Sequence, residues 1–112
     1  MGSISINSIQ LFSVYDAMGR KRTLAFINAS MSSSYTSGGD TLSLSSYFSS
    51  IEAVVCQSHA GGYALEASAS GTTVTVVARY YDYDAAADGT AVEVPAATDL
   101  SAVSFTMVVL GD

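Results

Sequence analysis

The sequence predicts an all-β protein, an antiparallel β-sandwich of about seven or eight short strands with a jelly-roll-like character. Three observations lead to this prediction. Short runs of alternating apolar and polar residues recur, turn residues separate them, and no apolar pattern keeps a helical period. A length of 112 residues is typical of one domain, so we expect residues 1–112 to form a single sandwich.

Two hairpins are predicted from local pattern. The runs "SIQLFSVYD" and "KRTLAFINA" are rich in β-prone residues, and the turn "AMGR" joins them. Residues 1–12 are expected to form an arm or an edge strand. The second hairpin is centred on Ser70 and Gly71. In its second arm the residues predicted to share one face are Val74, Val76, Ala78 and Tyr80.

The remaining strands are less regular. The last segment, "VSFTMVVLG", is apolar on both faces in its second half, which predicts a central strand. "IEAVVCQS" and a short "VEV" before Pro95 are further strands. Residues 30–41 are mostly Ser, Thr and Gly, which predicts an exposed connection.

The charge content narrows the classes of function. Charged residues make up only 12% of the chain, about half of the usual share near 25%. Much of the exterior must therefore be Ser, Thr, Ala, Gly and Tyr, a surface that is compatible with coverage by other subunits. The net charge is −6 with four Lys and Arg, which excludes broad nucleic-acid binding. No run has the length of a membrane-spanning helix and no signal peptide is recognised, so we expect a soluble product made in a cytoplasm.

Catalytic patterns are not found, and the chain is predicted not to be an enzyme and to need no cofactor. His59 is the one histidine, and with Cys56 it gives two of the four ligands that a structural zinc site needs. No serine lies in a nucleophile elbow. Cys56 is expected to pack as a small apolar side chain.

The segment "DYDAAADGTAVE" partly resembles a calcium-binding loop. Asp82, Asp84, Asp88 and Glu93 occupy four ligand places of such a loop. Because Ala86 and Ala87 replace a ligand and the turn glycine, the prediction is an acidic solvated loop without metal. A sugar-binding surface is kept as an alternative, since Tyr can stack on sugars although the chain has no Trp.

Four stretches carry a family resemblance: "YTSGGDTLSLSSYFSSIEAVV", "GGYALEASASGTTVTVV", "TDLSAV" and the terminal "FTMVVLG". Together they resemble small virion structural proteins encoded in tailed-phage head gene clusters, over residues 33–111. The resemblance implies a capsid decoration or cement protein on the outer surface of the shell, bound to the major capsid protein and often a homotrimer. The alternatives are a phage neck, tail or fibre-associated protein, or a small carbohydrate-binding module.

The serine-rich segment is predicted to be a seam against a neighbouring subunit. It has neither the charge of a solvated linker nor a base to activate a serine. Gly38 and Gly39 are expected to turn the chain sharply. The residues predicted to lie in this interface are Tyr35, Gly38, Gly39, Asp40, Leu42, Tyr47, Phe48, Tyr80, Tyr81 and Tyr83.

Overall fold

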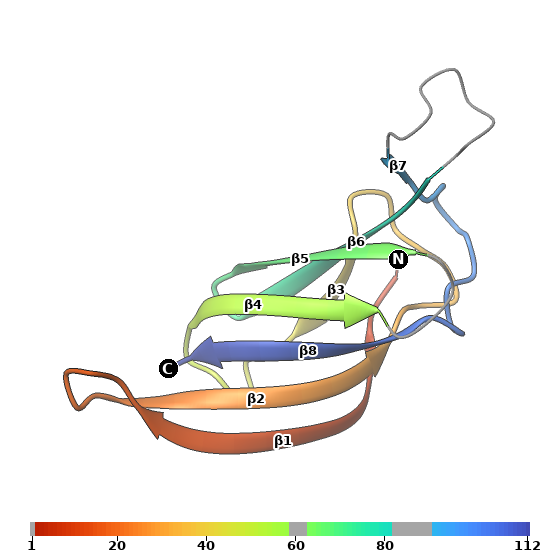
Figure 1. Ribbon diagram of the computed structural model, residues 1–112. Helices are drawn as coiled ribbons and strands as arrows, with labels where there is room; N and C mark the ends of the chain where they lie inside the picture. Colours follow the sequence, from red (N-terminus) through yellow and green to blue (C-terminus); the bar gives the residue numbers. More distant parts are fainter. Residues whose placement is uncertain (1, 59–62, 82–90) are drawn as a thin grey trace.

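The chain forms two antiparallel β-sheets that pack face to face (Figure 1). The computed structural model describes residues 2–58, 63–81 and 91–112. Within these residues all regular structure is β-strand, so the predicted all-β sandwich is confirmed. The strands are β1 (Ser5–Tyr15), β2 (Lys21–Ser30), β3 (Asp40–Ser43), β4 (Ile51–Ser58), β5 (Ala64–Ser70), β6 (Thr73–Tyr81), β7 (Ala91–Glu93) and β8 (Ser104–Gly111).

The two sheets differ in strand order. The first, here called the β8 sheet, has the order β1-β2-β8-β4. The second, the β6 sheet, has the order β3-β6-β5, and β7 also pairs with β6. The predicted hairpins are both present as β1–β2 and β5–β6, and β8 is central as predicted. The chain crosses between the sheets after β2, β3, β4 and β7.

The core lies between the two sheets and follows the alternation of the strands. On β8, Phe105, Met107 and Val109 point inward and are fully buried. Their partners across the interior are the β6 residues of the predicted apolar face, of which Val74, Val76 and Ala78 are fully buried and Tyr80 is partly buried. Burying one such aliphatic or aromatic side chain contributes about 1.5–3 kcal/mol, so these strands hold the sandwich together.

Most sheet edges have a neighbour. β4 and β5 lie against each other, with Cys56 Sγ donating to the Leu65 carbonyl at 3.6 Å, and the Ile51 N–H donates to the carbonyl of Gly71 in the turn after β5 at 2.9 Å. The edge of β3 is met by the N-terminal segment, where Ile4 N–H donates to the Thr41 carbonyl at 2.9 Å. β1 is different, because its one pairing partner among the described strands is β2. It is therefore an edge strand, the second of the two forms expected for the N-terminal residues.

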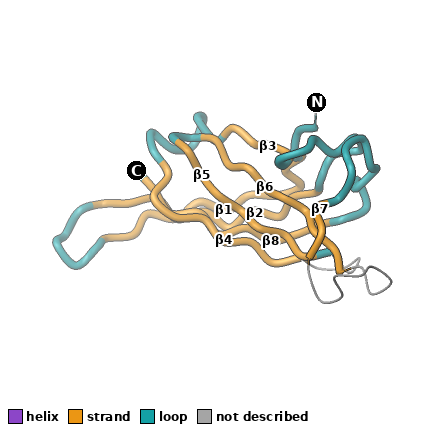
Figure 2. Tube along the Cα trace, turned by 90° about the horizontal axis from the view of Figure 1, so that it is seen from above, coloured by secondary structure: helices purple, strands orange, loops and turns teal. Residues whose placement is uncertain are grey.

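The turn of the β1–β2 hairpin projects beyond the rest of the sandwich in both views (Figures 1 and 2). The Asp16 carboxylate closes this turn by accepting hydrogen bonds from the N–H groups of Met18 and Arg20, both at 2.9 Å. These bonds hold the pKa of Asp16 below its ordinary value, with the Arg20 N–H contributing most. The Arg20 side chain also pairs with Asp16 at 3.6 Å, while Arg22 pairs with Glu52 and Asp112.

Candidate functional site

The serine-rich segment is anchored by a buried carboxylate. Asp40 is fully buried, and its Oδ2 accepts hydrogen bonds from the Ser32 N–H at 3.0 Å and the Ser32 hydroxyl at 2.7 Å. Its Oδ1 accepts from the Thr36 N–H at 3.0 Å. A buried charge is tolerated only where hydrogen bonds replace its water. These three bonds therefore tie both ends of the segment to the first residue of β3.

A second anchor joins Tyr35 to β7. The Tyr35 hydroxyl donates to Glu93 Oε2 at 2.7 Å and accepts from the Ala78 N–H at 3.1 Å. The same Glu93 oxygen accepts from the Gly38 N–H at 2.7 Å. Burial, with a smaller contribution from Glu93, raises the pKa of Tyr35 to about 12, while the hydrogen bond from Tyr35 lowers the pKa of Glu93. The tyrosine stays neutral and the carboxylate charged at neutral pH.

The prediction that the serine-rich segment contacts a neighbouring subunit is therefore wrong for its buried residues. Tyr35 has 1% of its surface exposed, and Asp40 and Phe48 are also buried within their own chain, so a neighbouring subunit has no access to them. Gly39 is buried as well, at φ +120°, and a Cβ there would lie 2.6 Å from Thr75 Cγ2. The sequence did not reveal this because Glu93 lies 58 residues from Tyr35.

The other predicted interface residues are scattered. Leu42 and Tyr80 are partly buried against the core. Gly38 and Tyr47 are exposed at separate places. Tyr83 and the side chain of Tyr81 lie outside the described residues, as do His59 and the three aspartates weighed for calcium. Glu93, the fourth residue of that set, is bonded to Tyr35 and Gly38.

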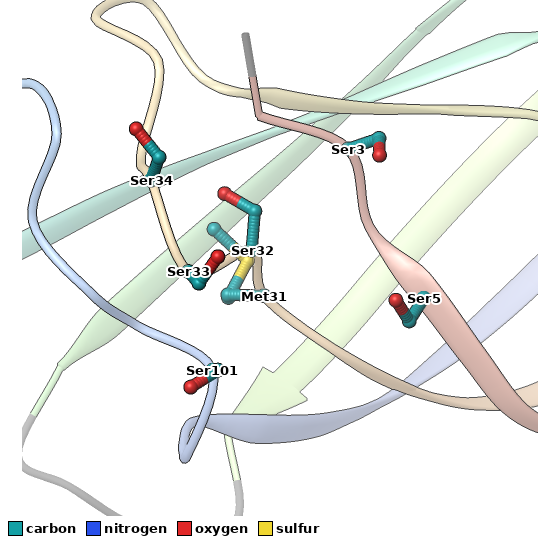
Figure 3. A pocket seen from close by; sticks show the side chains of 7 residues that line it. All are labelled: Ser3, Ser5, Met31, Ser32, Ser33, Ser34 and Ser101. Carbon is teal, nitrogen blue, oxygen red and sulfur yellow. The ribbon is translucent and has the colours of Figure 1, made fainter.

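A shallow pocket of about 340 Å³ opens beside the serine segment (Figure 3). Its lining is Ser3, Ser5, Met31, Ser32, Ser33, Ser34 and Ser101. No imidazole or carboxylate is part of this described lining, and the Ser32 hydroxyl already donates to Asp40. A serine needs a neighbouring base to become a nucleophile, so these residues offer hydrogen bonds but no activated group.

The described residues gather no metal ligands, and the serine pocket offers no surface for sugar stacking. Over residues 2–58, 63–81 and 91–112, no three His, Cys, Asp or Glu side chains gather as metal ligands. The serine pocket has no aromatic side chain in its lining on which a sugar ring would stack. Cys56 is partly buried against the core, as predicted, and burial raises the pKa of its thiol.

A more distinctive feature is the outer face of the β8 sheet, the side that points away from the β6 sheet. The strand register arranges its side chains in rows across the four strands. The first row is Phe12, Leu24, Leu110 and Ala53, and the second is Gln10, Phe26, Val108 and Val55. Phe12, Phe26 and Val55 are exposed large side chains, and the rings of Phe12 and Phe26 meet edge to face at 5.7 Å. We call these two rows the apolar face.

The apolar face has sharply different borders. On one side lies a row of neutral polar residues, in which Asn28 donates to Ser8 and accepts from Thr106. On the other side, the Arg22 guanidinium donates a hydrogen bond to Glu52. Its Nε also forms an ion pair with Asp112 Oδ1 at 2.8 Å, but the geometry of this contact is not that of a hydrogen bond. All charges at this border are paired, which leaves the apolar face itself uncharged.

The sequence carries a signal for this face in strands that are apolar on both sides. Val108 and Leu110 face outward opposite Phe26 and Leu24, so both central strands are apolar on two sides. On β8 this pattern predicted a central position, which is correct. In a sandwich of two sheets, however, no third layer of the described chain covers the outer side.

Comparison with known proteins identifies no relative. No protein-family model matches the chain, and searches of curated proteins and of solved structures gave no significant match. Among the described residues no helix has the length and hydrophobicity to cross a membrane.

Proposed function

We propose that this chain is a non-enzymatic structural protein of a phage virion that binds the outer surface of the capsid as a decoration or cement protein. The apolar face is its contact surface. The observation that carries this proposal is the row arrangement of Phe12, Phe26, Val55 and their neighbours on one exposed sheet face. The resemblance to tailed-phage virion proteins supplies the kind of partner.

The size of the apolar face suits a specific contact. Four strands spaced about 4.8 Å apart and two rows of side chains cover on the order of 300 Å². A patch of this size is comparable to the largest apolar patch on a typical monomer, and such patches often serve binding. Together with the neutral row beside Asn28, the uncharged area approaches half of the roughly 800 Å² that each partner buries in a standard interface.

The chemistry of the face favours a neutral protein partner. Removing water from charged groups is expensive, whereas aliphatic and aromatic side chains gain free energy when covered. The face is also rigid, because every strand in it is paired, and a rigid surface loses little entropy on binding. Binding through it should therefore depend only weakly on salt, unlike binding through exposed ion pairs.

The test uses virions that carry this chain and a pair of matched variants. Phe26 and Tyr47 are similarly exposed, at 41% and 38%, but Tyr47 lies outside the apolar face. Particles stripped of the protein are incubated with wild type, Phe26→Asp or Tyr47→Asp, and shell occupancy is measured by cryo-electron microscopy. We expect Phe26→Asp to reduce binding at least tenfold and Tyr47→Asp to bind like wild type.

Several outcomes would overturn the proposal. Density for the chain at the neck, tail or fibres would select the alternative virion role. Failure of the wild-type chain to bind any particle would exclude both. Full occupancy by folded Phe26→Asp, or an equal loss with Tyr47→Asp, would remove the apolar face from the contact. Urea unfolding of both variants checks that they fold.

A further inference from the structure

The edge of β1 is the long strand edge that the described chain leaves open. β4 and β5 lie against each other, with Cys56 Sγ donating to the Leu65 carbonyl at 3.6 Å, and the N-terminal segment meets β3. β1 spans 11 residues, and its described pairing is with β2 alone. An open edge presents unpaired N–H and C=O groups, which bind another strand readily.

The usual protection of an edge strand is missing from most of β1. Its sequence, "SINSIQLFSVY", contains no charged residue and no proline. The register shifts once, between Ile6 and Ser8, and from Ser8 to Tyr15 it is regular. Natural proteins shield such edges with lysines, prolines or bulges. The eight regular residues have none of these, although Leu11, Phe12 and Tyr15 are exposed hydrophobic side chains.

We propose that two copies of this chain pair through β1, antiparallel, about a twofold axis normal to the sheet and centred at Leu11 or Phe12. In an antiparallel pair, directly opposite residues lie on the same side of the sheet. Such an axis therefore joins the two β8 sheets into one and places both outer faces on one side. The contact is closed, because the same strand serves in both copies.

Charge argues for a second copy as the occupant of this edge. The chain carries a net charge of −6, so two copies repel one another wherever charged surfaces meet. Along Ser8–Tyr15 no charged residue lies on the strand itself. Antiparallel pairing also sends the charged turns, with Asp16 and Arg20, to opposite ends of the joined sheet. The neutral edge is thus where two acidic molecules meet without like charges in contact.

The area predicts a dimer of moderate affinity. Leu11, Phe12 and Tyr15 are about half-exposed or more, and side chains of this size offer about 200 Å² each when free. These three side chains supply roughly 300 Å² of exposed surface per copy, and the backbone of the eight regular residues adds further area. The total falls at the lower end of specific interfaces, as for dimers that dissociate on dilution.

This inference does not depend on capsid binding, since it concerns the purified chain alone. It also differs from the homotrimer implied by the resemblance. A trimer would require β1 to bind a different surface of its neighbour, because one edge cannot pair with itself around a threefold axis. The measured mass distinguishes the two assemblies.

Crosslinking tests the geometry. Cys56 is the one cysteine of the chain, so a Cys56→Ser background leaves each introduced thiol alone. Leu11→Cys and Phe12→Cys are compared with Met18→Cys in the hairpin turn, using a short bismaleimide. Antiparallel pairing brings residue 11 or 12 of the two copies together, whereas residue 18 of one copy lies roughly 30 Å or more from its counterpart. We expect crosslinked dimer at position 11 or 12 and little at 18; the reverse pattern overturns the proposal.

Sedimentation distinguishes association through the β1 edge from association through the apolar face. Leu11 and Val55 are exposed at 48% and 63% on the first and last strands of the same sheet. We expect the wild type to approach twice the 11.5 kDa of one chain at high concentration. Leu11→Lys should raise the dissociation constant at least tenfold, because like charges oppose across the axis, and Val55→Lys should leave it unchanged. A monomeric wild type, a trimer, or equal effects of the two substitutions would overturn the pairing.

Discussion

The serine segment and the β1–β2 hairpin are opposites in sequence and in structure. The segment around residues 31–40 is polar and rich in Ser and Gly, yet Tyr35 and Asp40 within it are buried. The hairpin has the regular alternation of core strands, yet Leu11, Phe12 and Phe26 are exposed. Composition alone assigns these two regions to the wrong environments.

The difference lies in where each region finds its partners. The segment turns its polar groups toward two carboxylates, and its backbone is bonded to residues 97–103 through contacts such as Tyr35 N–H to the Thr98 carbonyl at 2.9 Å. The hairpin belongs to one sheet, in which β1 pairs with β2 alone, and among the described residues no third layer covers it. The segment should therefore govern stability and the hairpin should govern association.

Loss of the Asp40 carboxylate is expected to have the largest effect on folding. Asp40→Ala removes an acceptor of three hydrogen bonds and leaves the N–H groups of Ser32 and Thr36 without their partner. We expect the free energy of unfolding in urea to fall by about 3 kcal/mol. Asp99→Ala is the control, because the exposed Asp99 accepts only from Ser101 and should cost well under 1 kcal/mol. Equal losses would contradict the distinction.

Removing the Tyr35 hydroxyl should have the next largest effect. Tyr35→Phe keeps the buried ring but leaves the Ala78 N–H without its acceptor and takes one donor from Glu93. We expect a loss of about 1–2 kcal/mol in the free energy of unfolding. Tyr47→Phe, at an exposed tyrosine, is the matched control and should be neutral. An unchanged midpoint for Tyr35→Phe would mean that this anchor does not hold the segment.

The same tyrosine predicts a dependence on alkaline pH. Its folded pKa of about 12 lies above the model-compound value of 10.0, so the folded state retains a proton that the unfolded state loses. The stabilising contribution is complete below pH 10 and disappears as the pH rises toward 12. Urea unfolding between these values should show a steeper loss for the wild type than for Tyr35→Phe. Parallel curves would contradict the assignment.

The smallest effect on folding is expected in the hairpin. Phe12→Ser removes an exposed ring and its edge contact with Phe26. Since the ring is only half-buried, the free energy of unfolding should change by about 1 kcal/mol or less. Phe105→Ser, in the buried core, is the contrast and should cost several times more. A large loss with Phe12→Ser would show that the hairpin is part of the folding core.

Local pattern predicted the strands well but could not place the candidate site. The β5–β6 turn and the inward face of β6 followed from alternation, since Val74, Val76 and Ala78 are all buried. Tyr35 and Asp40 were predicted to face a neighbouring subunit because the segment that contains them has the composition of a surface loop. Their true environments depend on Glu93, Ser32 and Gly2, which contact them only after the chain has folded.

The sequence by itself determined that this chain forms an antiparallel sandwich, because alternation and turn residues act between near neighbours. It also determined that the exterior carries little charge, which is a matter of composition. Only the tertiary structure decided which polar residues are buried and which apolar ones form an exposed face. The physical reason is that burial depends on the pairing order of the strands, and that order brings together residues distant in the chain.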